Sequence, residues 1–225
     1  MIVVVNPSNP TGGVFSKETL EKLSEIAVKH DLLVVADEIY SQLVYDGTKH
    51  VSVASLPGMK ERTITLGGFS KAYSMTGWRL GYMCAPKEVI QACVRVHQYT
   101  ITCASSFVQD AAVTALKDCA DDVEAMRQEY QRRKDYMVKA LNEIDGISCN
   151  NPQGAFYIFV NVKSLGMSSM EVAEYLLEHA KIALVPGSAF GSEGEGYPRI
   201  SYACSYEDLQ EAAARMKAAI AELKK

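Results

Sequence analysis

The chain has 225 residues, of which 48% are hydrophobic and 22% are charged. This composition is typical of a folded chain with a buried core, and it excludes extended intrinsic disorder. The formal net charge is −4 and no long run of like charge occurs, which argues against a nucleic-acid partner.

The six cysteines are scattered along the chain and form neither a C-x-x-C pair nor a cluster with histidine. A metal site is therefore not expected. The apolar run that opens the chain, over residues 1–5, is too short for a signal sequence or a membrane span. We expect no membrane partner, a cytoplasmic location and reduced thiols.

The first half of the chain alternates predicted strands and helices. A buried strand over 3–5 leads into a polar loop over 6–13, and Ser16 is suited to cap a helix that ends at His30-Asp31. A second buried strand over 32–36 ends just before Asp37. This order predicts a right-handed crossover and a parallel sheet. The next predicted elements are a strand at 62–66, a loop at 67–77, a strand at 78–84 and helices at 87–99, 105–116 and 121–144.

The pattern changes after the long charged helix, which Gly146 is suited to terminate. An aromatic-rich strand is predicted at 156–162, then a helix at 169–180, strands near 183–185 and at 199–203, and a helix at 206–223. We therefore predict an α/β fold with two domains. A mostly parallel sheet forms a large domain over 1–120, and a smaller α/β C-terminal domain covers 121–225.

Three polar residues lie at or just after predicted strand ends, where parallel sheets bind ligands: Asn9, Asp37 and Lys71. Each by itself is as readily a turn former or a solvated side chain. The segments around them are more specific. They read NPTG from residue 9, ADEIY from residue 36 and GFSKAYSMTGWRLG from residue 68. In this order and spacing they resemble class I/II aminotransferases of fold type I, in the aspartate aminotransferase superfamily, along the whole chain.

The resemblance implies a pyridoxal 5′-phosphate (PLP) cofactor, which serves such enzymes as an electron sink. Lys71 would be the catalytic residue and would form a Schiff base with the cofactor aldehyde. Asp37 would face the pyridine nitrogen, whereas Tyr40 and Asn9 would hydrogen-bond the phenolic oxygen. The alternatives are a structural ion pair for Asp37 and a packed core aromatic for Tyr40.

Two arginines resemble the anion-binding arginines of the family. Arg79 would bind the cofactor phosphate, for which a planar guanidinium is well suited. Ser70 would either donate its hydroxyl to the same phosphate or only turn the chain before Lys71. Arg199 would bind the substrate α-carboxylate beside Asn9, and its alternative is a surface salt bridge.

The resemblance thus implies an aminotransferase that moves an amino group between an L-amino acid and a 2-oxo acid. Two alternatives remain open, a PLP-dependent carbon–sulfur β-lyase and a non-catalytic PLP-sensing regulatory domain. The family's N-terminal segment, which supplies further cofactor contacts, is not found in these 225 residues. We expect a homodimer for the full-length protein. For this chain alone we expect weak PLP binding. We also expect an exposed sheet edge and apolar face that favour aggregation or pairing with the missing segment.

Overall fold

The computed structural model describes residues 1–223 and divides into two compact units. The first unit contains Met1–Ser8 and Gly13–Arg127. The second contains Asn9–Gly12 and the residues from Gln128 onward. The long helix α4 (Ala120–Asn142) therefore begins in the first unit and continues into the second.

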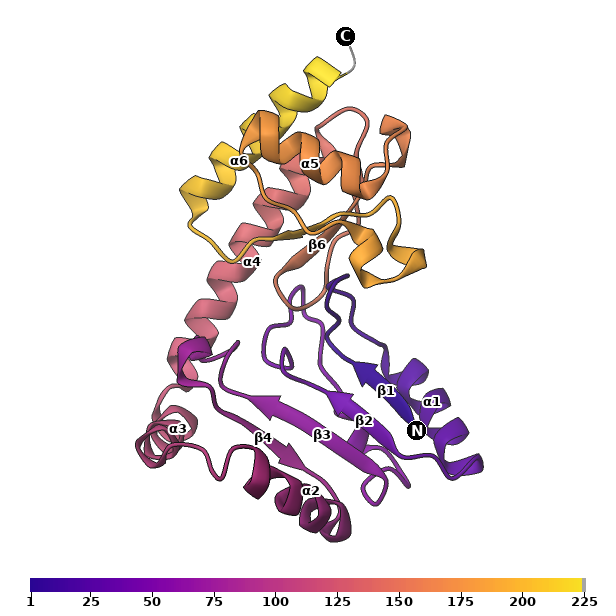
Figure 1. Ribbon diagram of the computed structural model, residues 1–225, viewed down its shortest axis with the longest axis vertical. Helices are drawn as coiled ribbons and strands as arrows, with labels where there is room; N and C mark the ends of the chain where they lie inside the picture. The colour runs from indigo at the N-terminus through magenta and orange to yellow at the C-terminus, as the bar shows by residue number, and fades with distance from the viewer. Residues whose placement is uncertain (224–225) are drawn as a thin grey trace. The chain divides into compact units, whose positions relative to one another are not determined.

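A four-stranded sheet forms the centre of the first unit, in the order β1-β2-β3-β4 (Figure 1). Neighbouring strands among the first three are parallel, whereas β4 is antiparallel to β3. Val5 lies opposite Asp37, and Asp37 lies opposite Leu66, so the carboxyl ends of the three parallel strands share one edge of the sheet. The strands are β1 (Ile2–Val5), β2 (Val34–Asp37), β3 (Thr63–Gly68) and β4 (Gly81–Cys84).

Helix α1 (Lys17–Lys29) packs on this sheet through its apolar side. It begins where predicted, because the Ser16 hydroxyl accepts a hydrogen bond from the Thr19 N–H at 3.2 Å and satisfies a free backbone donor of the first turn. Leu20 and Ala27 are fully buried against strand residues such as Val34. This cluster fixes one face of the sheet and so the strand ends beside it.

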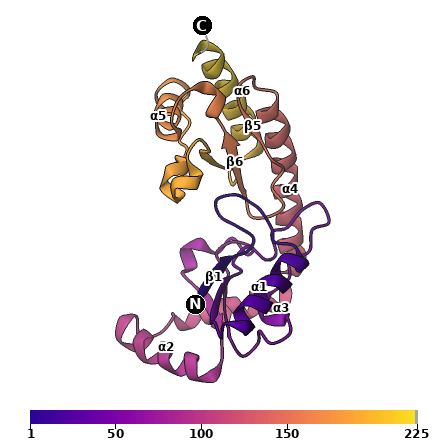
Figure 2. The same ribbon diagram turned by 90° about the vertical axis from the view of Figure 1, so that its right-hand side faces the viewer.

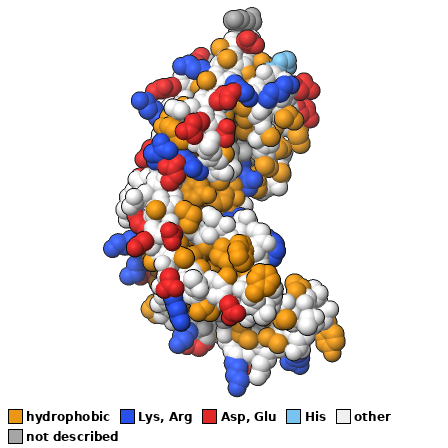
Figure 3. Space-filling model, turned by 90° about the vertical axis from the view of Figure 1, so that its left-hand side faces the viewer, with side chains coloured by type: hydrophobic (Ala, Val, Ile, Leu, Met, Phe, Trp, Pro, Cys, Tyr) orange, Lys and Arg blue, Asp and Glu red, His pale blue; other side chains and the backbone are white. Residues whose placement is uncertain are grey.

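Helices α2 (Lys87–Thr100) and α3 (Ser106–Asp118) follow β4. Ala112 and Ala115 of α3 pack against Phe69, in the loop after β3. Helix α2 by contrast has no buried residue. Large hydrophobic side chains are exposed in this region, and Figure 3 shows hydrophobic side chains gathered on one of its faces. The exposed residues include Trp78, Tyr82, Val96, Tyr99, Ile101 and Phe107.

The second unit has an antiparallel sheet in the order β5-β6-β7, with α5 and α6 beside it (Figure 2). Helix α5 (Ser169–Ala180) starts with a capping box, in which the Ser168 hydroxyl accepts from the Glu171 N–H and the Glu171 carboxylate accepts from the Ser168 N–H. The remaining elements are β5 (Ser148–Cys149), β6 (Tyr157–Asn161), β7 (Arg199–Ser201) and α6 (Tyr206–Leu223).

Two predicted strands are wrong in extent. The strand predicted at 78–84 begins only at Gly81, because Thr76–Trp78 form a 3-10 turn and Arg79 is left-handed, with φ +53°. The strand predicted at 183–185 is reduced to an isolated bridge between Val185 and Arg199.

Two smaller predictions also differ from the structure. Val3 is 62% exposed, not buried, because β1 is an edge strand covered on one face. Helix α4 ends at Asn142, so Gly146, with φ +96°, turns the chain after the helix and does not cap it. No helix within residues 1–223 is long and apolar enough to cross a membrane.

Candidate functional site

Asp37 and Lys71 leave the sheet of the first unit at the same edge. Asp37 is the last residue of β2, and Lys71 follows the end of β3 by three residues. The Asp37 Oδ1 accepts a hydrogen bond from the Ile39 N–H at 3.1 Å, which fixes the direction of the carboxylate. Because β2 and β3 are parallel neighbours, both side chains belong to the edge where parallel sheets bind ligands.

Tyr40 and Lys71 are brought together at this edge. The Lys71 Nζ lies 5.7 Å from the centroid of the Tyr40 ring. Tyr40 is only 3% exposed, and Lys71 is half-buried in the turn after β3. A buried ring therefore forms one wall beside the lysine amine, a placement that restricts where the amine can point.

Ser70 and Arg79 lie in the loop between β3 and β4. Ser70 is half-buried and directly precedes Lys71 in the turn. Arg79 is exposed, and its Nη1 donates a hydrogen bond to the Thr76 carbonyl at 2.8 Å. This bond uses one of the five guanidinium donors, so the side chain keeps donors for an anion.

Arg199 and Asn9 are brought together in the second unit. The Arg199 Nη1 donates a hydrogen bond to Asn9 Oδ1 at 2.7 Å, although the two residues are 190 positions apart. Arg199 opens β7, where it lies opposite Phe159, and its backbone N–H donates to the Val185 carbonyl at 2.8 Å. The backbone of the arginine is thus held on both sides.

Two aromatic rings hold the Arg199 guanidinium. Its Cζ lies 4.4 Å from the centroid of the Tyr157 ring and 5.0 Å from that of the Phe190 ring, both within cation–π range. The Arg199 Nε is buried and has no hydrogen-bond partner among the described residues. A buried donor without a partner is costly, so this guanidinium is suited to an acceptor such as a carboxylate.

The Asn9–Gly12 segment is held beside Arg199 by backbone hydrogen bonds. The Gly12 carbonyl accepts from the N–H groups of Gln153 and Gly154, at 2.9 and 2.8 Å. Gly12 has φ +69°, and a Cβ at this position would lie 2.5 Å from the Cβ of Pro152. Glycine alone combines this positive φ with such a close backbone contact, which explains why the NPTG segment has glycine at position 12.

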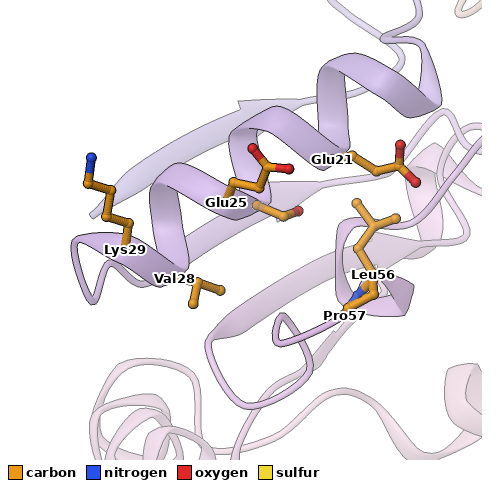
Figure 4. Close-up of a pocket in the computed structure, with 7 residues that line it drawn as sticks. Glu21, Glu25, Val28, Lys29, Leu56 and Pro57 are labelled. Carbon is orange, nitrogen blue, oxygen red and sulfur yellow. The ribbon is translucent and has the colours of Figure 1, made fainter.

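A hollow of about 540 Å³ lies apart from these residues, between α1 and the turn after the 3-10 helix η1 (Val53–Ser55). Figure 4 shows Glu21 and Glu25 of α1 on one side of it and Leu56 and Pro57 on the other. None of the residues predicted for the site lines this hollow. It carries no set of groups suited to a reaction.

Sequence reasoning missed some of the residues around the predicted ones. Phe190 was not singled out, because its contact with Arg199 is made between distant segments. Tyr157 was not missed entirely: residues 154–157 resemble a family stretch near the substrate mouth, although the resemblance has low specificity because strands are often aromatic. The contact between Glu38 and His50, 3.2 Å apart, was also missed, and no local pattern indicates it.

Comparison with known proteins shows the family to which the chain belongs. The family model for aminotransferase class I and II matches residues 1–216. An aromatic-amino-acid aminotransferase of Thermococcus litoralis and an aspartate aminotransferase of Pyrococcus abyssi are each 50% identical over 225 residues. Each alignment covers 99% of this chain and 58% of the relative. The crystal structure of an aromatic aminotransferase from Pyrococcus horikoshii matches with a TM-score of 0.97 at 48% identity, covering 99% of this chain and 60% of that one.

The chain therefore belongs to the class I and II aminotransferase family and has the α/β fold of its members, as predicted. It spans somewhat more than half the length of the curated relatives that it matches.

Proposed function

We propose that this chain carries the cofactor lysine and the carboxylate-binding arginine of a PLP-dependent aminotransferase. The reaction would move an amino group between an L-amino acid and a 2-oxo acid. The observation that carries the proposal is the Lys71 amine beside the buried Tyr40 ring, at the sheet edge where Asp37 ends its strand. The family match over residues 1–216 supports it.

The residues of the first unit fit the chemistry of PLP. When bound, this cofactor supplies an electron sink for the bonds at the substrate α-carbon. We assign Asp37 to the pyridine nitrogen, since a fixed carboxylate stabilises a protonated ring, and Tyr40 to the phenolic oxygen. Arg79 and Ser70 would bind the phosphate. Arg79 would do so through the guanidinium N–H groups that do not donate to the Thr76 carbonyl.

Lys71 would have two tasks. Its amine would hold the cofactor covalently before substrate arrives, and once released it would move a proton from the substrate α-carbon. The wall formed by the Tyr40 ring limits the positions open to the amine. A restricted amine reaches its target more often than a freely rotating one.

Arg199 and Asn9 would bind the part that all amino acids and 2-oxo acids share. The α-carboxylate would accept hydrogen bonds from the guanidinium, including the buried Nε that lacks a partner. The 2.7 Å hydrogen bond from the Arg199 Nη1 to Asn9 Oδ1 would fix the orientation of the guanidinium. We also assign Asn9 a contact with the cofactor phenolic oxygen.

The proposal also covers the roles of the two units, the location and oligomeric state of the whole protein, and its substrates. We propose the first unit as the PLP-binding domain and the second as the small domain, with a boundary inside α4 at Arg127. For the whole protein we propose a cytoplasmic homodimer that contributes to amino acid metabolism. The two relatives are named for aromatic amino acids and for aspartate, so both should be tested as amino donors.

The proposal is tested by joining the chain to the family's N-terminal segment, incubating it with PLP, reducing with borohydride and locating the added mass by peptide mapping. We expect the label on Lys71, none in Lys71→Ala, and unchanged labelling in the exposed control Lys60→Ala. Labelling that persists in Lys71→Ala would contradict the proposal.

Product analysis then separates the possible reactions. A new amino acid matched by a new 2-oxo acid supports an aminotransferase. Release of pyruvate and ammonia would indicate a β-lyase, and cofactor binding without any turnover would indicate a regulatory domain.

A further inference from the structure

Tyr40 belongs to a loop of the first unit that begins at the end of β2 and closes on itself. The loop runs from Glu38 to the 3-10 helix η1. Three short backbone turns shape it, made by the N–H groups of Ser41, Leu43 and Thr48. None of these turns joins the beginning of the loop to its end. Such a connection requires a contact between residues farther apart in the sequence.

The Glu38 carboxylate makes that longer contact. One oxygen, Oε1, accepts a hydrogen bond from the Val53 N–H at 3.0 Å, and the other, Oε2, lies 3.2 Å from the His50 Nε2. Both partners belong to the far end of the loop. The Glu38 N–H donates to the Leu66 carbonyl of β3 at 2.9 Å, so the carboxylate is itself tied to the sheet.

The pair is buried, with the Glu38 side chain 9% exposed and the His50 side chain 12% exposed. A buried carboxylate without partners is strongly unfavourable, so Glu38 holds the loop end close. The His50 Nδ1 has no hydrogen-bond partner among the described residues, and its Nε2 contact with Glu38 lacks the alignment of a hydrogen bond. Glu38 is therefore the main polar contact of this imidazole.

One further ionisable group, Tyr82 of β4, interacts electrostatically with Glu38. The pKa of Tyr82 is raised mainly by burial, with a smaller contribution from the Glu38 carboxylate. The effect of the Glu38 charge thus reaches β4, two strands away from β2 in the sheet. This phenol is neutral at neutral pH and so adds no charge beside the carboxylate.

We propose that Glu38 and His50 are positioning residues, which close the 38–53 loop and thereby hold the Tyr40 ring beside Lys71. Tyr40 is two residues from Glu38, and its ring centroid is 5.7 Å from the Lys71 Nζ. Loosening the loop end would let the ring move away from the amine. The inference rests on the proposed function, because it assigns this pair an effect on the cofactor site.

The first test needs no cofactor. Hydrogen–deuterium exchange of peptides over 39–53 is compared among the unchanged chain, Glu38→Gln and His50→Gln. We expect about tenfold faster exchange in both variants, because each leaves a buried group without its partner. Glu25→Gln and His30→Gln, both exposed on or next to α1, are the matched controls and should leave the exchange unchanged. Unchanged exchange in both test variants would overturn the proposal.

The second test separates positioning from a purely structural role. After PLP loading, the pH midpoint of the Lys71-dependent visible absorption band is measured in Glu38→Gln, His50→Gln, Tyr40→Phe and the Glu38→Gln/Tyr40→Phe double variant. Positioning through Tyr40 predicts that all single variants shift the midpoint in one direction, and that the double variant shifts no further than Tyr40→Phe. Reduced thermal stability with an unmoved midpoint would show a structural pair only and would overturn the inference.

The two proposals fail in different ways. If the chain joined to the family's N-terminal segment acquires no Lys71-dependent band, the proposed function fails and this inference fails with it. If the band forms and the Glu38 and His50 variants match the unchanged chain, only the positioning role is lost. His50→Gln, which leaves the carboxylate and its bond to Val53 in place, serves if Glu38→Gln does not fold.

Discussion

The two rings beside Arg199 lead to a quantitative prediction. Phe190 is 37% exposed, and its ring centroid lies 5.0 Å from the Arg199 Cζ. Replacing it with leucine keeps an apolar side chain but removes the aromatic face. A cation–π contact at a partly exposed site contributes about 0.5–1 kcal/mol. We therefore expect Phe190→Leu to raise the KM for the amino acid about two- to fivefold at unchanged kcat, because the guanidinium is held less firmly.

The assay combines steady-state transamination with a chemical measurement that needs no turnover. Phenylglyoxal modifies accessible guanidinium groups, and peptide mapping reports its reaction at Arg199. We expect faster modification in Phe190→Leu and a rate close to the original in Phe190→Tyr, which keeps the ring. An unchanged KM together with an unchanged modification rate in Phe190→Leu would refute the argument that this ring restrains Arg199.

Three further predictions concern stability and reactivity. Leu20→Ala should lower the free energy of unfolding by about 2–5 kcal/mol in denaturant titrations, because the side chain is fully buried, whereas Ile26→Ala, at a position 52% exposed on the same helix, should change it little. The pKa of Glu129 is lowered to about 2, chiefly by hydrogen bonds from Arg132, so its stabilisation is present above pH 4.5 and is lost as the pH falls toward 2. Since the Glu129 side chain is 35% exposed, we expect Glu129→Gln to lower the free energy of unfolding by only about 1 kcal/mol at pH 7 and by nearly nothing at pH 2. Denaturant titrations that give an equal loss at both pH values would contradict this. Burial raises the pKa of Cys149 to about 11, so at pH 8 this thiol should react with iodoacetamide more slowly than the exposed cysteines, as mass spectrometry would show.

The sequence by itself determined the elements whose signals are local. Helix α5 was predicted at its observed bounds, because its capping box and the spacing of its apolar residues lie within one continuous stretch. The NPTG, ADEIY and lysine segments predicted the family for a similar reason, since their order and spacing are properties of the chain alone. Asp37 was placed at a strand end because a buried run stops there.

Only the tertiary structure decided the contacts between distant residues. Nothing near β4 in the sequence shows that it runs antiparallel to β3, since pairing direction depends on the path of the whole loop between them. The rings of Tyr157 and Phe190 on Arg199 follow from how three separate segments meet. The Glu38–His50 contact likewise depends on loop closure. Pairing the two side chains offsets the cost of burying them, and neither residue belongs to a periodic pattern in the sequence.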